Sequence, residues 1–144
     1  MFRKSLFVLI TMQFITAFFH SLSFINQPVG RNETEKQLID LFVNYKQDLG
    51  MGIHRSTYDL FTGLSLCFTL ICVLGGLINL FFLRKGLPQE FWPGLLKIEI
   101  IVFGAVFLSM LVFTFLPPIV CTALIFFTSI FAYYFSTKYA LDAR

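Results

Sequence analysis

Long uncharged, apolar stretches alternate with short polar segments along the 144-residue chain. A helix needs about 20 predominantly apolar residues to cross the hydrocarbon core of a bilayer. Stretches of this kind lie at about 5–24, 60–83, 95–116 and 118–136. Only Pro117 and Pro118 separate the last two, which are therefore expected to form an antiparallel hairpin, with Pro118 in the first turn of the fourth helix. The pattern predicts an all-α integral membrane protein, a four-helix up-down bundle forming a single domain over residues 1–144.

Residues 25–57 form a sizeable segment that is not expected to span the membrane. Its apolar residues are separated by polar ones at regular intervals instead of forming one continuous run. Asn32 followed by Glu35 is typical of a capping box at a helix start, and Gly50 is a suitable helix stop. Between them apolar residues recur at helical spacing, namely Leu38, Leu41, Phe42, Tyr45 and Leu49. The segment is thus expected to hold an extracytoplasmic amphipathic helix, and two placements stay open: flat in the headgroup layer, or over the bundle as a lid.

Composition strengthens the membrane interpretation. The chain is 57% hydrophobic and only 13% charged, whereas soluble domains carry about 25% charged residues. The net charge of +3 is spread thinly and forms no basic stripe, so we expect no nucleic acid partner. Cys67, Cys72 and Cys121 all lie in apolar runs without a CxxC pair, and His20 and His54 alone make a weak metal site. We therefore expect no cofactor and no metal.

The placement of lysine and arginine predicts how the chain is threaded. If the N-terminus is cytoplasmic, the cytoplasmic segments carry Arg3, Lys4, Arg84, Lys85, Lys97, Lys138 and Arg144. The opposite segment carries Arg31, Lys36, Lys46 and Arg55, balanced there by acidic residues. The positive-inside rule then places both termini in the cytoplasm. Because residues 5–24 end without an A-x-A site, we expect the first span to remain uncleaved.

Small and polar residues form a seam along one face of the second span. Steps of three and four separate its members, Thr62, Ser65, Thr69, Cys72, Gly76 and Asn79. Small residues allow helix backbones to approach closely in lipid, so this face is expected to be a helix-packing face. The first span has a similar pattern with Gln13, Thr16, His20 and Ser23, and the fourth has Thr122, Ser129, Ala132 and Ser136.

A further group of residues has both a structural and a functional interpretation. Gln13 and His20 are functional candidates, because polar residues at membrane depth are commonly functional. Ser56 and Asp59 fit a capping box before the second span. Asp59 is also a candidate ligand-binding residue near one membrane face, together with His20, Arg55 and Tyr58, and Gln13 is counted with this ligand-binding group.

Glu99, near the start of the third span, has three interpretations, all left open. It lies at the interface, pairs with a lysine, or takes part in a proton relay.

The stretch MGIHRSTYDLFTGLSLCF and the glycine pair and NLFF that follow it resemble the signature of an uncharacterised family of small four-helix membrane proteins of bacteria. The resemblance is confined to residues 51–83 and rests on Met51, Gly52, Arg55, Ser56, Asp59, Gly63 and Ser65. It implies a bacterial inner membrane as the location and implies no activity.

Two functions follow as expectations. The first is a structural or accessory role carried out through membrane lipid, a protein partner or a second copy of the chain. The alternative is a membrane-embedded binding protein or enzyme for a lipid-like or anionic small molecule, with a pocket at the outer ends of the first two spans. Whether the protein is an enzyme stays open, and the lack of an internal repeat disfavours a transporter.

Overall fold

The structure is a computed structural model that describes residues 1–25 and 29–142. The chain is all-α, as expected. Its long helices are α1 (Phe2–Ser21), α3 (Thr57–Lys85), α4 (Trp92–Phe113) and α5 (Leu116–Asp142). The shorter elements are η1 (Leu22–Phe24), α2 (Glu33–Asn44), β1 (Lys46–Asp48), β2 (His54–Ser56) and η2 (Gln89–Phe91).

Four helices of the described chain are long and apolar enough to cross a membrane. They overlap the four stretches expected from the sequence, although α1 ends at Ser21 instead of 24 and α4 ends at Phe113 instead of 116. Lipid offers no partners to backbone N–H and C=O groups, so a spanning segment satisfies them internally as a helix. The membrane location that the sequence predicted is supported by this length and composition.

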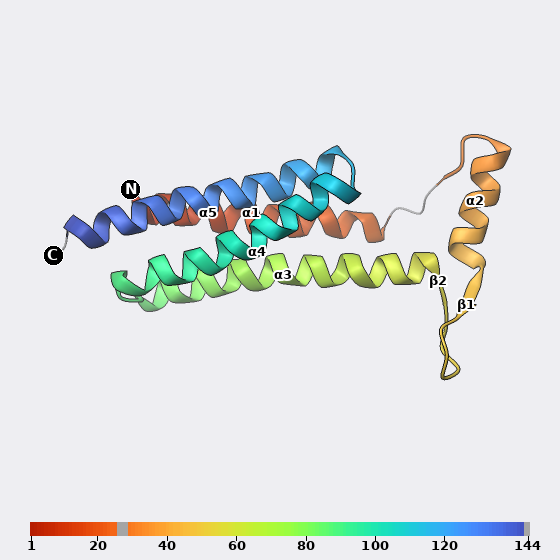
Figure 1. Cartoon of the computed structure of the whole chain (residues 1–144), viewed down its shortest axis with the longest axis horizontal. Helices are drawn as coiled ribbons and strands as arrows, with labels where there is room; N and C mark the ends of the chain where they lie inside the picture. Colours follow the sequence, from red (N-terminus) through yellow and green to blue (C-terminus); the bar gives the residue numbers. More distant parts are fainter. Residues whose placement is uncertain (26–28, 143–144) are drawn as a thin grey trace. The chain divides into compact units, whose positions relative to one another are not determined.

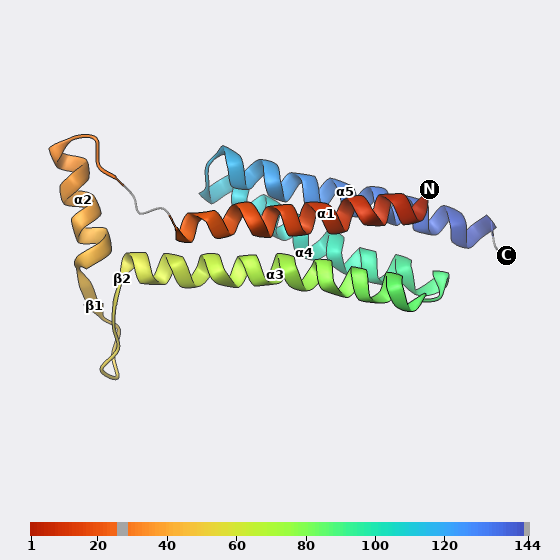
Figure 2. The same cartoon turned by 180° about the vertical axis from the view of Figure 1, so that it is seen from behind.

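The chain divides into two compact units, which are described separately. The helix unit comprises Met1–Ala17 and Ile71–Arg144, and the hairpin unit comprises Phe18–Leu70. Within the helix unit, α1, the second half of α3, α4 and α5 alternate in direction along the chain (Figures 1 and 2). Its apolar core includes Leu6 and Leu9 of α1, Leu96 of α4 and Ile125 of α5, all fully buried.

The turn between the last two long helices differs from the expectation in one respect. Helix α4 ends at Phe113 and α5 begins at Leu116, so Pro117 lies inside the first turn of α5 instead of separating the two helices. Pro118 lies in this turn as expected. Thr114 has an extended backbone, with φ −131° and ψ −171°, at the end of α4. Proline is tolerated in a first helical turn because the N–H it lacks has no acceptor there.

The hairpin unit corrects the expected extent of the amphipathic helix. Asn32 caps α2 as expected, its Oδ1 accepting a hydrogen bond from the Glu35 N–H at 2.8 Å. The helix ends at Asn44 and not at Gly50, because β1 and β2 follow as an antiparallel hairpin. At its turn Gly50, Met51 and Gly52 all have positive φ, a conformation that glycine adopts without steric cost.

Candidate functional site

Three polar side chains meet in the apolar interior of the helix unit. Gln13 of α1 and Asn79 of α3 are fully buried, and Glu99 of α4 is 7% exposed. Gln13 Nε2 donates to Glu99 Oε2 at 3.3 Å, and Asn79 Nδ2 donates to Glu99 Oε1 at 2.7 Å. Asn79 Nδ2 also donates to Gln13 Oε1 at 3.2 Å. We call these three residues the amide–carboxyl cluster.

Helical periodicity and a glycine bring the cluster together. Glu99 lies between Leu96 and Phe103 at helical spacing, and all three are buried, so the carboxyl lies on the packed face of α4. Gly75 lies one turn before Asn79 on α3, and a Cβ atom there would be 2.8 Å from Gln13 Nε2. The glycine therefore leaves the space that the Gln13 amide occupies.

The hydrogen bonds of the cluster are unevenly distributed. Both carboxyl oxygens of Glu99 accept an amide N–H, and the Gln13 oxygen accepts one as well. Asn79 Oδ1 is buried and lacks a hydrogen-bond partner among the described residues. A buried acceptor without a donor is costly, so the cluster has an open position for one more donor or for a cation.

Most of the seam of small and polar residues lies on the buried side of α3, whereas its first two members, Thr62 and Ser65, are half-buried. Thr69, Cys72, Gly76 and Asn79 are buried, whereas Leu64, Leu70, Leu74 and Leu77 are exposed on other sides of the helix. A Cβ atom at Gly76 would be 3.0 Å from the ring of Phe14 on α1. The seam thus provides close approach between helices, as small residues do in membranes.

The corresponding residues of α5 are buried as well. Thr122, Ser129, Ala132 and Ser136 are all fully buried. The recorded hydrogen bonds of the three hydroxyls go to backbone carbonyls three or four residues earlier in the same helix. These hydroxyls are satisfied locally, and what they contribute to packing is their small size.

The other candidate residues belong to the hairpin unit. His20 is half-buried, with its ring in edge contact with Phe68 at a centroid distance of 4.9 Å. The Tyr58 ring contacts that of Phe42 on α2 at 6.0 Å. Gln13, by contrast, has its partners in the helix unit. A ligand pocket formed by His20, Tyr58 and their neighbours stays a prediction.

Ser56 and Asp59 form the capping box that the sequence predicted. The Ser56 N–H donates to Asp59 Oδ2 at 3.0 Å, and the Asp59 N–H donates to Ser56 Oγ at 3.1 Å. Arg55 is exposed on β2, and its guanidinium donates to the His54 carbonyl oxygen at 3.2 Å. Asp59 therefore has a structural task at the start of α3.

The capping box leads to a prediction about stability. Asp59→Ala leaves the Ser56 N–H without its acceptor and removes the carboxylate from the positive end of the helix dipole, so it should lower the stability of the protein. The thermal midpoint of the detergent-solubilised protein, followed by circular dichroism, measures this loss. Arg55→Ala is the matched control and should leave the midpoint unchanged. Equal losses in the two variants would assign the effect to the local charge balance and not to the cap.

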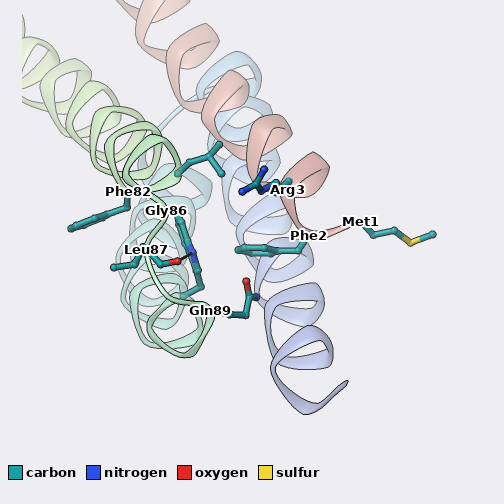
Figure 3. Close-up of a pocket in the computed structure, with 9 residues that line it drawn as sticks. Met1, Phe2, Arg3, Phe82, Gly86, Leu87 and Gln89 are labelled. Carbon is teal, nitrogen blue, oxygen red and sulfur yellow. Dashed lines mark hydrogen bonds between the residues drawn. The ribbon is translucent and has the colours of Figure 1, made fainter. Parts of the chain in front are cut away.

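A cavity of about 320 Å³ lies in the helix unit, at the end where α1 begins and α3 ends. Its lining includes Phe2 and Arg3 of α1, Phe82 of α3, Gln89 of η2 and Trp92 of α4. Phe2 points toward Gly86 and Leu87 across the cavity, with Arg3 beside it (Figure 3). The cavity therefore has an apolar body and a cationic edge.

Two of the side-chain N–H groups around this cavity form hydrogen bonds within the protein. Trp92 Nε1 donates to the Leu87 carbonyl oxygen at 3.3 Å, and Gln89 Nε2 donates to the Ser136 carbonyl oxygen at 3.3 Å. Arg3 is exposed, and its guanidinium forms no recorded ion pair or hydrogen bond with any described residue. Arg3 is thus the charged group available to a ligand.

Comparison with known protein families, with curated proteins and with solved structures finds no match.

Sequence reasoning identified all the members of the cluster but not the cluster itself. It assigned Gln13 to ligand binding, Asn79 to helix packing and Glu99 to several open roles. Arg3 was used only to predict how the chain is threaded through the membrane. Its immediate neighbours in the sequence did not indicate that it lines a cavity. The basic residues at the ends of the first two spans were the signal that could have found this site.

Proposed function

We propose that this protein is a small multi-pass membrane protein with an accessory role, which it carries out by holding an anionic phospholipid. In this proposal it lies in the inner membrane of a bacterium with both termini in the cytoplasm. The cavity beside Arg3 is the observation that carries the proposal. It combines an available guanidinium with an apolar lining at one end of the membrane-spanning helices.

The lining matches the chemistry of a phospholipid. Arginine binds phosphate oxygens through planar, paired N–H donors. The rings of Phe2, Phe82 and Trp92 provide apolar surface for the first carbons of an acyl chain. The cavity volume lies at the lower end of the range for ligand sites, about 300–1,000 Å³, so it suits a headgroup region rather than a whole lipid.

The surroundings of the cavity are positively charged. The same end of the helix unit carries Arg3, Lys4, Arg84, Lys85 and Lys138. Glu90 is the acidic residue at this end among those whose side chains the structure describes. Anionic lipids of the cytoplasmic leaflet attract juxtamembrane basic residues by about 1 kcal/mol for each Lys or Arg. The charge favours an anionic headgroup and agrees with a cytoplasmic position for this end.

Native mass spectrometry of the detergent-extracted protein tests the proposal. Phosphatidylglycerol and phosphatidylcholine are added separately at equal concentration, and the bound fraction is measured for each. The wild-type protein should retain more phosphatidylglycerol, because only this lipid has a net negative charge for Arg3 to neutralise. Arg3→Gln should lower phosphatidylglycerol retention to the level of phosphatidylcholine.

Arg55→Gln is the matched control, since it removes one exposed cation from the hairpin unit and should leave the lipid preference unchanged. Equal losses in both variants would mean that the net charge and not the cavity attracts the lipid. Unchanged retention in Arg3→Gln would contradict the proposal. The same spectra report the oligomeric state, and a stable dimer without bound lipid would favour a second copy of the chain as the partner.

A further inference from the structure

The amide–carboxyl cluster lacks a positive charge. Glu99 is the acidic residue in it, and its recorded partners are the neutral amides of Gln13 and Asn79. Lys97 lies two residues away on α4, but its Nζ lies 5.8 Å from the ring centroid of Tyr133 on α5. A carboxylate at membrane depth is stable only when it is paired or neutralised.

The nearby titratable groups do not provide that charge. The helices packed around Glu99 carry Cys72 on α3 and Cys121 and Tyr133 on α5, which are neutral groups or at most become anionic. They also carry basic residues, namely Arg3 and Lys4 on α1 and Arg84 and Lys85 on α3, and none of these forms an ion pair with Glu99 in the described part of the chain. Among the described residues, only Gln13 and Asn79 are recorded as hydrogen-bond partners of Glu99. The neutralising charge must therefore come from solution.

The unpartnered oxygen of Asn79 is a second, independent indication. Asn79 is fully buried, its Nδ2 donates both to Glu99 and to Gln13, and its Oδ1 has no donor among the described residues. An amide oxygen accepts a hydrogen bond or coordinates a hard cation. The amide that donates to the buried carboxyl thus also carries an acceptor oxygen without a donor.

We propose that the cluster of Gln13, Asn79 and Glu99 binds one monovalent cation from solution, either a proton or Na⁺. Uptake of one positive charge neutralises the carboxylate. If the cation is a proton, it forms an O–H bond on Glu99; if it is Na⁺, the carboxylate and amide oxygens coordinate it. Because the three residues come from α1, α3 and α4, occupancy couples the cation concentration to the packing of three helices.

The composition of the cluster disfavours other metals. Ca²⁺ takes six to eight oxygen ligands, commonly from several carboxylates, and transition metals are held by sets of imidazole, thiolate and carboxylate groups. Within the described part of the chain, no three His, Cys, Asp or Glu side chains lie together so that they could hold a metal ion. The cluster contains one carboxyl group, so one positive charge is sufficient to neutralise it.

Reaction with dicyclohexylcarbodiimide tests the proposal in the whole protein. A protonated carboxyl group adds to this reagent, and the O-acylisourea rearranges to an N-acylurea that retains all atoms of both reactants. In sodium-free choline buffer, peptide mapping should find Glu99 labelled several-fold more than the exposed Glu90. Labelling of Glu99 should fall as the pH is raised, since the reaction needs the protonated form.

Two arms distinguish the cations. Protection of Glu99 by NaCl, relative to choline chloride at equal ionic strength, assigns Na⁺ to the site. Labelling that responds to pH but not to NaCl assigns the proton. If Glu99 is labelled no more than Glu90 from acidic to alkaline pH, the carboxyl does not take up a proton in an apolar site and the proposal is overturned.

A second measurement keeps the proposal testable without the reagent. A ligand that binds the folded state raises the thermal midpoint as its concentration increases. The wild-type midpoint should rise with proton or Na⁺ concentration, whichever cation is bound. Glu99→Gln keeps the side-chain shape and removes the charge, so this response should be lost. Identical responses of the two proteins in both titrations would overturn the proposal.

Discussion

Replacing Asn79 by leucine is expected to lower the free energy of unfolding by about 3 kcal/mol. The substitution removes the 2.7 Å hydrogen bond to Glu99 and the 3.2 Å hydrogen bond to Gln13 at a position that is fully buried. A buried polar group that loses its partner costs about 1–3 kcal/mol, and the carboxyl would lose its shortest hydrogen bond. Fluorescence of Trp92, the single tryptophan, measures unfolding because its ring is buried against Phe2 in the same unit.

The triple variant Gln13→Met, Asn79→Leu and Glu99→Met identifies the cause. It removes the carboxyl together with both amides that donate to it, and replacing a whole buried polar group by apolar side chains is often close to neutral. The triple variant should therefore recover a large part of the stability lost in the single variant. No recovery would show that leucine is too large for this position and that the carboxyl is not responsible. A single variant as stable as the wild type would contradict the energetic role of the cluster.

The sequence predicted the spanning helices because membrane helices have a strong local signal. About 20 apolar residues in a row are sufficient to recognise one, and the burial of one face follows from small residues at helical spacing. The α3 seam illustrates this. Cys72, Gly76 and Asn79 were placed on one face by spacing alone, and all three are buried in the structure.

The hairpin of β1 and β2 was missed because its signal is weak and overlaps with a helical one. Each strand has only three residues, and β1 is polar. The helical pattern of apolar residues continued through Tyr45 to Leu49, which favoured a longer helix. The sequence Gly50-Met51-Gly52 was the available clue, since two glycines one residue apart are typical of a turn with positive φ.

The cluster could not be predicted, because its contacts are far apart in the sequence. Gln13 and Glu99 are separated by 86 positions, and Asn79 and Glu99 by 20. Each residue had a reasonable local interpretation, and only the packing of α1, α3 and α4 shows that they share hydrogen bonds. The unpartnered oxygen of Asn79 depends on the same packing, so nothing in the sequence pointed to it.

Gly104 lies at a close approach between α4 and α5, and Gly104→Leu is expected to destabilise the helix unit by about 3 kcal/mol, at the upper end of the cost of overpacking. A Cβ atom at Gly104 would lie 2.9 Å from Cε2 and 3.3 Å from Cδ2 of Phe126. The Phe126 ring is stacked on Phe107 at a centroid distance of 5.8 Å and contacts Phe127 at 5.3 Å, so neighbouring rings restrict its movement. The helices would have to separate to admit the new side chain.

Gly94→Leu provides the matched control on the same helix. Among the described residues, no atom outside the adjoining part of the same helix lies within 4 Å of a Cβ atom built at Gly94, so the same substitution gains helix propensity there without a clash. The loss of thermal midpoint in Gly104→Leu should be partly reversed by adding Phe126→Ala, because the smaller side chain makes room for the leucine. If both leucine variants lose stability equally, side-chain size on α4 is responsible and the close approach to Phe126 is not. If Gly104→Leu alone is unstable and Phe126→Ala rescues it, this glycine sets the distance between α4 and α5.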